Sequence, residues 1–114
     1  MNIADRVARE VMDWRFDPSD RSWYAPRWDE REQKYVDALM AHQEGWNPMK
    51  FWGQAGEVLD RMRELGFQVS IFTVSGKRSD SVYFEHADGR RAHRVGELKE
   101  AICLAALVAV EDER

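Results

Sequence analysis

The sequence predicts an α+β fold, a three-layer α/β/α sandwich whose small antiparallel sheet has helices on both faces. Three segments carry apolar residues at helical spacing: residues 2–14, 48–65 and 97–110. Three others have the composition or alternation of strands: residues 67–74, 81–86 and 90–95. Ile71–Val74 is almost entirely apolar, which is typical of a strand that is covered on both sides. Helices on both faces of the sheet would provide that cover.

The totals limit the kinds of protein that this chain can be. Its 114 residues are enough for one hydrophobic core, so we expect a single domain, residues 1–114. The net charge of −4 comes from mixed charges, which argues against a general nucleic-acid-binding protein. No apolar run reaches the roughly 18 residues of a membrane span, and the first residues do not resemble a signal peptide. We therefore expect an intracellular protein without a membrane partner.

Residues 2–14 are expected to form the first helix. Ile3, Val7 and Val11 lie on one helical face. Asn2 is a favourable N-cap, because its side-chain oxygen can accept a hydrogen bond from a first-turn amide. Asp5 lies in the first turn, where the helix dipole favours a negative charge.

Residues 15–46 are predicted to be irregular and rich in aromatic residues. Pro18 and Pro26 interrupt the segment, and no apolar period continues through it. Two alternatives remain open at this stage. Trp23–Ala25 or Lys34–Asp37 could add edge strands to the sheet, and Arg31–Glu44 could form a short helix.

The same segment holds most of the candidate ligand-binding residues. Rings and arginines alternate there, and one basic residue of the later hairpin joins them. The candidates are Arg21, Trp23, Tyr24, Arg27, Trp28, Trp46 and Arg91. In one interpretation the rings pack the segment onto the core. In the other, the rings stack on a base and the guanidinium groups hold phosphate, as in a nucleotide pocket.

A capped helix followed by a strand is predicted at the centre of the chain. Asn47 is the expected N-cap, and Pro48 suits the first helical position because its missing N–H has no helical partner there. Gly66 is placed where a left-handed residue would end the helix at residue 65. Residues 67–74 then form the strand.

Asp88-Gly89 predicts a two-residue hairpin turn between the strands 81–86 and 90–95. That turn would set His86 opposite Arg91 and place Arg91, His93 and Val95 on the same face as Val82 and Phe84. Lys77, Arg78, Arg90, Arg91 and Arg94 make residues 77–94 locally basic. His86 and His93 would be diagonal neighbours, but a metal site needs further ligands that the sequence does not place, so no metal is predicted.

The last helix, residues 97–110, is apolar most of the way round. Such a helix is deeply buried or has a second partner, which leaves room for a homodimer. Cys103 lies within it and is expected to be a small core residue. It is the only cysteine, so no internal disulfide is possible.

No catalytic residues, cofactor or metal are predicted. The groups with suitable chemistry are His42, Ser75, His86, His93 and Cys103. None of them belongs to a triad, a nucleophile elbow or a metal-binding pattern. We therefore expect that the protein is not an enzyme.

Several segments resemble one family of phage proteins. They are the N-terminal helix up to Trp14, the Trp46-Asn47-Pro48 start with Ala55 and Glu57–Arg63, and the run Glu97–Leu107. Together they are similar to the small phage and prophage proteins of the phage ABA sandwich domain. The resemblance implies an α/β/α sandwich and a phage accessory protein in the host cytoplasm, without an assigned activity. Two functions fit: anti-defence by binding a nucleotide-type immune signal, or direct inhibition of a host defence protein or nuclease.

Overall fold

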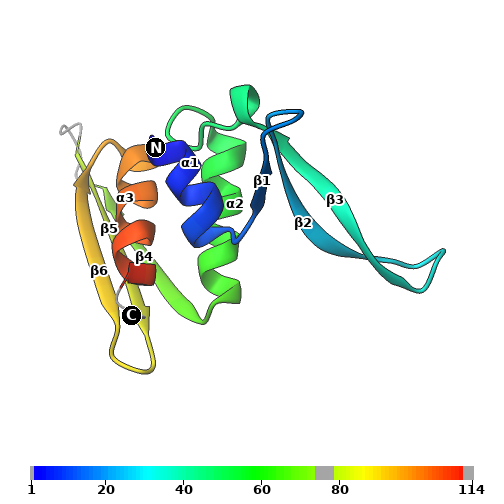
Figure 1. Ribbon diagram of the computed structural model, residues 1–114. Helices are drawn as coiled ribbons and strands as arrows, with labels where there is room; N and C mark the ends of the chain where they lie inside the picture. Colours follow the sequence, from blue (N-terminus) through cyan, green and yellow to red (C-terminus); the bar gives the residue numbers. More distant parts are fainter. Residues whose placement is uncertain (1, 74–78, 112–114) are drawn as a thin grey trace.

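The computed structural model describes residues 2–73 and 79–111 (Figure 1). The helical elements are α1 (Ile3–Arg6), η1 (Val7–Val11, a π-helical turn), η2 (Gln43–Gly45, a 3₁₀ turn), α2 (Trp52–Glu64) and α3 (Leu98–Glu111). The strands are β1 (Arg15–Asp17), β2 (Ser22–Asp29), β3 (Lys34–His42), β4 (Phe67–Thr73), β5 (Asp80–His86) and β6 (Arg91–Gly96). They form two antiparallel sheets, in the orders β1-β2-β3 and β4-β5-β6. The α+β class is confirmed.

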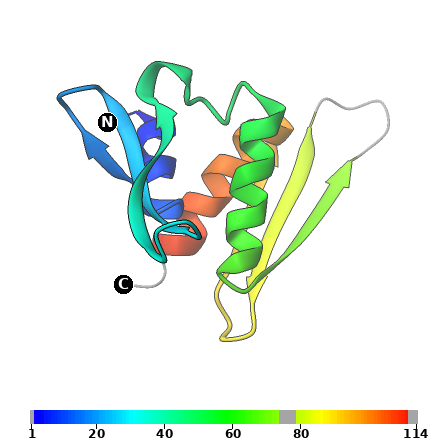
Figure 2. The same ribbon diagram turned by 90° about the vertical axis from the view of Figure 1, so that its right-hand side faces the viewer.

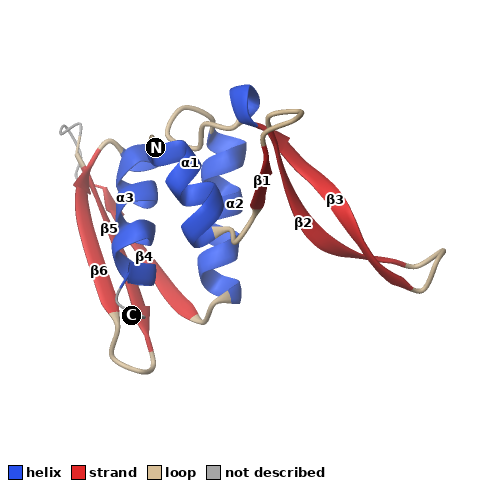
Figure 3. Ribbon diagram, in the orientation of Figure 1, coloured by secondary structure: helices blue, strands red, loops and turns tan. Residues whose placement is uncertain are grey.

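The expected α/β/α layering is not found in the described residues. The helices lie between the two sheets, as the colouring by element in Figure 3 and the turned view in Figure 2 both show. Helices α2 and α3 cover one face of β4-β5-β6, and no described element lies on its other face. The prediction failed because the apolar end of β4 is not covered on both sides. This strand is at the edge of its sheet, and Ile71 and Phe72 are 38% and 59% exposed. Val74 lies outside the described residues.

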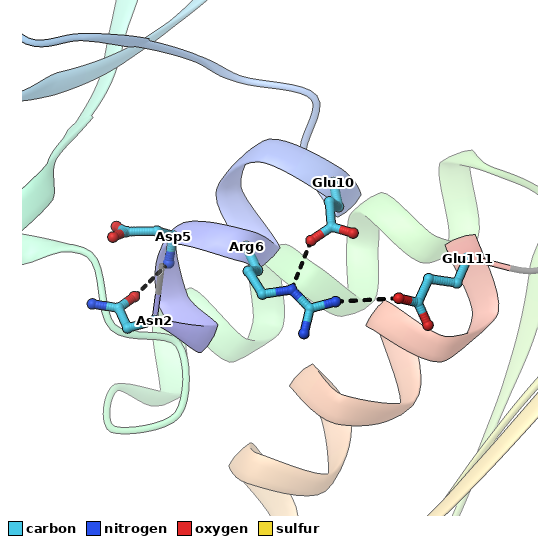
Figure 4. A network of polar contacts seen from close by, with 5 residues as sticks. All are labelled: Asn2, Asp5, Arg6, Glu10 and Glu111. Atoms are coloured by element: carbon cyan, nitrogen blue, oxygen red, sulfur yellow. Dashed lines mark hydrogen bonds and ion pairs between the residues drawn. The ribbon is translucent and has the colours of Figure 1, made fainter.

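The first helix is shorter than predicted. It runs from Ile3 to Val11 and widens into a π-helical turn at Val7, and Asp13, at φ 59°, turns the chain away before Trp14. The predicted cap is confirmed, because the Asn2 side chain accepts a hydrogen bond from the amide of Asp5 at 2.8 Å. Figure 4 shows how Arg6 joins this helix to α3. Its guanidinium contacts Glu10 at 2.9 Å and Glu111 at 3.3 Å, and the bond to Glu10 raises the Arg6 pKa.

Most of residues 15–46 is β-structure, so the predicted irregular region was wrong, and so was the helix at Arg31–Glu44. The two suggested edge strands lie inside β2 and β3. Pro26 is tolerated within β2 because β1 pairs only with residues 22–24, which leaves that edge of β2 free beyond Tyr24. The register of β2 and β3 shifts between Trp23 and Tyr24, where β3 has one extra residue, Met40.

Helix α2 starts four residues later than predicted. Asn47 is in a turn, where its carbonyl accepts hydrogen bonds from the amides of Lys50 and Phe51. The Gln54 side chain supports this turn, because it accepts from the amide of Asn47 at 2.6 Å and donates to the carbonyl of Gly45 at 2.7 Å. The end of the helix agrees with the prediction: α2 stops at Glu64, and Gly66 has φ 94°.

The hairpin between β5 and β6 has a three-residue loop instead of the predicted two-residue turn. His86 pairs with Arg90, and its carbonyl accepts the amide of Gly89, whose φ is 98°. Glu85 is therefore opposite Arg91, one position away from the predicted register. A shift of one residue moves every side chain of a strand to the other face. Arg91 and His93 consequently lie on the face opposite Val82 and Phe84, and the predicted proximity of His93 to His86 was wrong.

One hydrophobic core joins the helices to both sheets. Helix α3 runs through it as predicted, with Ala101, Ile102, Cys103, Ala105, Ala106, Leu107, Ala109 and Val110 buried. Within residues 2–73 and 79–111, no helix has the length and apolar character needed to cross a membrane.

Candidate functional site

Two of the seven predicted ligand-binding residues belong to the core. Trp23 is 1% exposed and packs against Phe16 with ring centroids 5.0 Å apart. Trp46 is 3% exposed, packs against Trp14 at 4.7 Å, and donates its indole N–H to the carbonyl of Ala4 at 2.9 Å. Neither ring has a free face for a ligand. For these two residues the packing interpretation holds.

Two more, Arg21 and Tyr24, lie at or next to the start of β2 and have partners of their own. The Tyr24 hydroxyl donates to the carboxylate of Asp20, and this hydrogen bond raises the pKa of the phenol. The Arg15 guanidinium lies 5.5 Å from the centre of the Tyr24 ring. Arg21 is exposed, has φ 54° and reaches Gln43 at 3.5 Å.

Arg27 and Trp28 lie in a projecting arm, which we define as residues 24–39, the part of the hairpin that extends away from the helices in Figure 1. Trp28 pairs with Tyr35 across the strands, their rings 5.2 Å apart, and Leu39 pairs with Tyr24. Side chains of alternate residues share a face of a sheet, so these residues lie on one side of the arm. Trp28, Tyr35 and Leu39 are 48%, 71% and 50% exposed. Pro26 and Asp37 lie on the same side, and Asp37 forms an ion pair with Arg15. We call the three exposed apolar side chains, Trp28, Tyr35 and Leu39, the apolar arm face.

A groove of about 400 Å³ separates the arm from α2 and the end of the first helix. It is lined by Met12, Trp14, Ala25, Pro26, Arg27, Met40, Glu57, Asp60, Arg61 and Glu64. The Arg61 guanidinium is already used, because its Nε donates to the carbonyl of Val11 and its Nη1 contacts Glu64. Three carboxylates against two guanidinium groups make this groove unfavourable for phosphate.

The seventh candidate, Arg91, is on the uncovered side of β4-β5-β6. The side chains on that side are Gln68, Ser70, Phe72, Ser81, Tyr83, Glu85, Arg91, His93 and Val95, as the strand pairing shows. We call this surface the open sheet face. Its rings form a row across three strands: Phe72 meets Tyr83 at 5.6 Å, and His93 is stacked on Tyr83 at 4.0 Å with 5° between the planes. The predicted candidates are therefore split between the core, the arm and the second sheet.

Sequence reasoning missed this row of rings because the hairpin register was wrong. With a three-residue loop at 87–89, the alternation of β5 and β6 would have put His93 beside Tyr83. The pattern for such a loop, a glycine at its last position, was present at Gly89.

A sequence profile of the phage ABA sandwich domain matches residues 5–107, from the first helix to α3. The chain belongs to the phage ABA sandwich domain family. Comparisons with curated proteins and with solved structures found no match. The family resemblance noted from the sequence is confirmed, and it covers the arm as well as both sheets.

In this phage ABA sandwich protein, Ser22, His42 and Cys103 are hydrogen-bonded or buried, whereas His93 is exposed and stacked on Tyr83. The Ser22 hydroxyl lies 2.8 Å from Nδ1 of His42, but Ser22 is fully buried and also donates to the carbonyl of Asp20. Burial raises the pKa of the Cys103 thiol to about 12. Ser75 lies outside the described residues, as do Lys77 and Arg78. Among the described residues, no three His, Cys, Asp or Glu side chains are grouped as metal ligands.

Proposed function

We propose that this protein is a non-catalytic phage accessory protein that acts in the host cytoplasm by binding another protein through its arm. The class of target that we propose is a host defence protein or nuclease. The observation that carries this proposal is the apolar arm face, where Trp28, Tyr35 and Leu39 stay exposed on a hairpin that stands away from the core.

The energetics of a projecting hairpin support a partner. A two-stranded ribbon without a third strand is marginally stable in water. Residues beyond Tyr24 have no strand on the β2 side, and the described part of the chain has none beyond β3. Exposed tryptophan and tyrosine side chains are the residues that most often supply binding energy at protein interfaces. Burial of this face by a partner would stabilise both the arm and the complex.

Capture of a nucleotide by the seven predicted residues has less support. It requires rings and guanidinium groups around one pocket, but Trp23 and Trp46 are buried, and Arg91 lies in the other sheet. The groove beside the arm has Arg27 at its edge, together with Glu57, Asp60 and Glu64. We therefore favour the protein-binding function.

The test is affinity capture from host lysate, followed by titration of the purified pair. The variant carries Trp28→Ser, Tyr35→Ser and Leu39→Ser. Its control carries Phe51→Ser and Trp52→Ser, exposed apolar residues at the start of α2, outside the arm and outside the lining of the groove. We expect one target to bind the wild type and the control equally, and to bind the arm variant at least about 100-fold more weakly, because hot-spot rings contribute 2 kcal/mol or more.

A thermal-shift measurement with a panel of cyclic and linear nucleotides separates the two functions. The protein-binding proposal predicts no shift that depends on Arg27 or Trp28. A shift that is lost in Arg27→Gln and in Trp28→Ser, without any captured protein, would reject the proposal in favour of nucleotide binding.

A further inference from the structure

We propose that the open sheet face binds a short single-stranded segment of nucleic acid, with bases stacked on the row Phe72–Tyr83–His93 and phosphates beside Arg91. This inference is independent of the arm and of its protein target.

The first step is the arrangement of the rings. Phe72 comes from β4, Tyr83 from β5 and His93 from β6, so the row crosses the whole sheet. Phe72 is 59% exposed and His93 is also exposed, while Tyr83 is half-buried between them. Exposed rings on neighbouring antiparallel strands are a recurrent platform for unpaired bases, because every base has a π-face.

The second step is charge. Residues 90–94 carry Arg90, Arg91, His93 and Arg94 on a single strand and the turn before it. Arg90 is used locally, because it contacts Asp88 at 2.8 Å and lies over the Phe67 ring. Arg91 is exposed on the open sheet face, where Glu85 is its cross-strand partner, whereas Arg94 pairs with Val82 and lies on the side of the sheet that faces the helices. Arg91 is two residues from His93 on the same face, about 7 Å along the strand, so one nucleotide could contact both.

The third step is the chemistry of the remaining side chains. Ser70 and Ser81 lie on either side of the Phe72–Tyr83 contact, Glu85 is opposite Arg91, and Gln68 is opposite Glu85 on the far strand. These hydroxyl, amide and carboxylate groups can donate to or accept from base edges. A stable dimer formed by packing two such sheets face to face would need a mostly apolar surface, and this face carries too many polar side chains for that.

The net charge of −4 does not oppose a local site of this kind. The carboxylates of the groove, on Glu57, Asp60 and Glu64, belong to α2, whose buried side is the one that faces β4-β5-β6. At physiological ionic strength, salt screens the interaction between exposed charges over about 8 Å. This distance is less than the thickness of a helical layer. Affinity for a few unpaired nucleotides is therefore compatible with the absence of a general basic surface.

The test is fluorescence anisotropy with labelled 12-nucleotide oligo(U) and oligo(dT), and with a duplex of the same length. The site variants are Phe72→Ala, His93→Ala and Arg91→Gln. Their matched controls are Tyr35→Ala, which removes an exposed ring from the arm, and Arg31→Gln, which removes a charge near the arm tip. All five residues are exposed, so the variants are expected to fold, and circular dichroism checks this.

We expect the single strands to bind more tightly than the duplex. Each ring variant should weaken binding about tenfold, since stacking contributes 1–3 kcal/mol per base. The logarithm of the binding constant falls as the logarithm of the salt concentration rises. Arg91→Gln should make this negative slope shallower by about 0.7, the value for one phosphate contact of a single strand. The two controls should leave affinity and slope unchanged.

Two results would overturn the inference. One is the absence of oligonucleotide binding up to millimolar protein. The other is an equal loss in Arg91→Gln and Arg31→Gln, which would show charge attraction without a site. Sedimentation distinguishes the causes of a negative result: a dimer that Phe72→Ala dissociates would assign this face to a second copy of the chain instead.

Discussion

Gly66 is the residue where the chain turns from α2 into β4, in a backbone conformation that other residues rarely adopt and close to the His86 ring. Its φ is 94°, and a Cβ would lie 2.7 Å from Nε2 of His86. We expect Gly66→Ala to lower the free energy of unfolding by about 1–3 kcal/mol, from backbone strain and this contact together. Urea denaturation measures the loss.

Gly56→Ala is the matched control for Gly66→Ala. Gly56 is in the interior of α2, and a Cβ there would have nothing within 4 Å. Because glycine is a poor helix former, this substitution should raise the free energy of unfolding by about 0.5–1 kcal/mol. Equal effects of the two substitutions would contradict the geometry at Gly66.

Cys103 links the stability of the fold to alkaline pH. Burial raises the thiol pKa from 9.0 to about 12 in the folded chain, whereas the unfolded chain titrates near the ordinary value. The stabilisation that comes from keeping the thiol protonated in the folded chain is therefore complete below about pH 9, and it is lost as the pH rises from 9 towards 12. Wild-type protein should lose up to about 1.4 kcal/mol per pH unit in that window, relative to Cys103→Ala. Parallel stability curves for the two proteins would show that the thiol is not buried.

The side chains of the arm should contribute much less to stability than the buried side chain of Trp23, which comes just before it in β2. Trp23 is buried, so Trp23→Ala should lower the free energy of unfolding by about 3–5 kcal/mol. Trp28 in the arm is 48% exposed, so Trp28→Ala should change the free energy of unfolding by no more than about 0.5 kcal/mol. Thermal or urea unfolding of the two variants makes the comparison. Similar losses would mean that the arm packs on the core.

At this scale the sequence predicted the elements whose pattern is local. The stripe Ala55, Val58 and Met62 and the apolar run of α3 lie where periodicity placed them. The arm was missed because its strands carry few buried residues and therefore no strict alternation. The register of β5 and β6 was missed because Asp88-Gly89 also fits the last two positions of a three-residue loop. Hydrogen bonding to the backbone settles this choice, since Asp88 accepts the amide of Arg90, and that bond lowers the pKa of the Asp88 carboxyl.

In the molecule as a whole, the helices form a layer between two sheets, and this arrangement decides which surfaces can bind. The sequence predicted the α+β class and the family, because both depend on the order of elements along the chain. It did not predict the order of the layers. The apolar stripe of a helix indicates that one side of the helix is buried, but not on which side of a sheet the helix lies. The candidate site was split for the same reason: Trp23 and Trp46 face the helices, while Arg91 faces outward.

The most direct test of this arrangement is the NMR relaxation enhancement that an inert, soluble gadolinium chelate causes at side-chain protons of β4-β5-β6. Strong enhancement is expected for Phe72, His93 and Val95, which lie on the open sheet face, and weak enhancement for Val82, Phe84 and Ala92, which face the helices. Equal protection of both groups would mean that the outer face is covered, and would contradict the account.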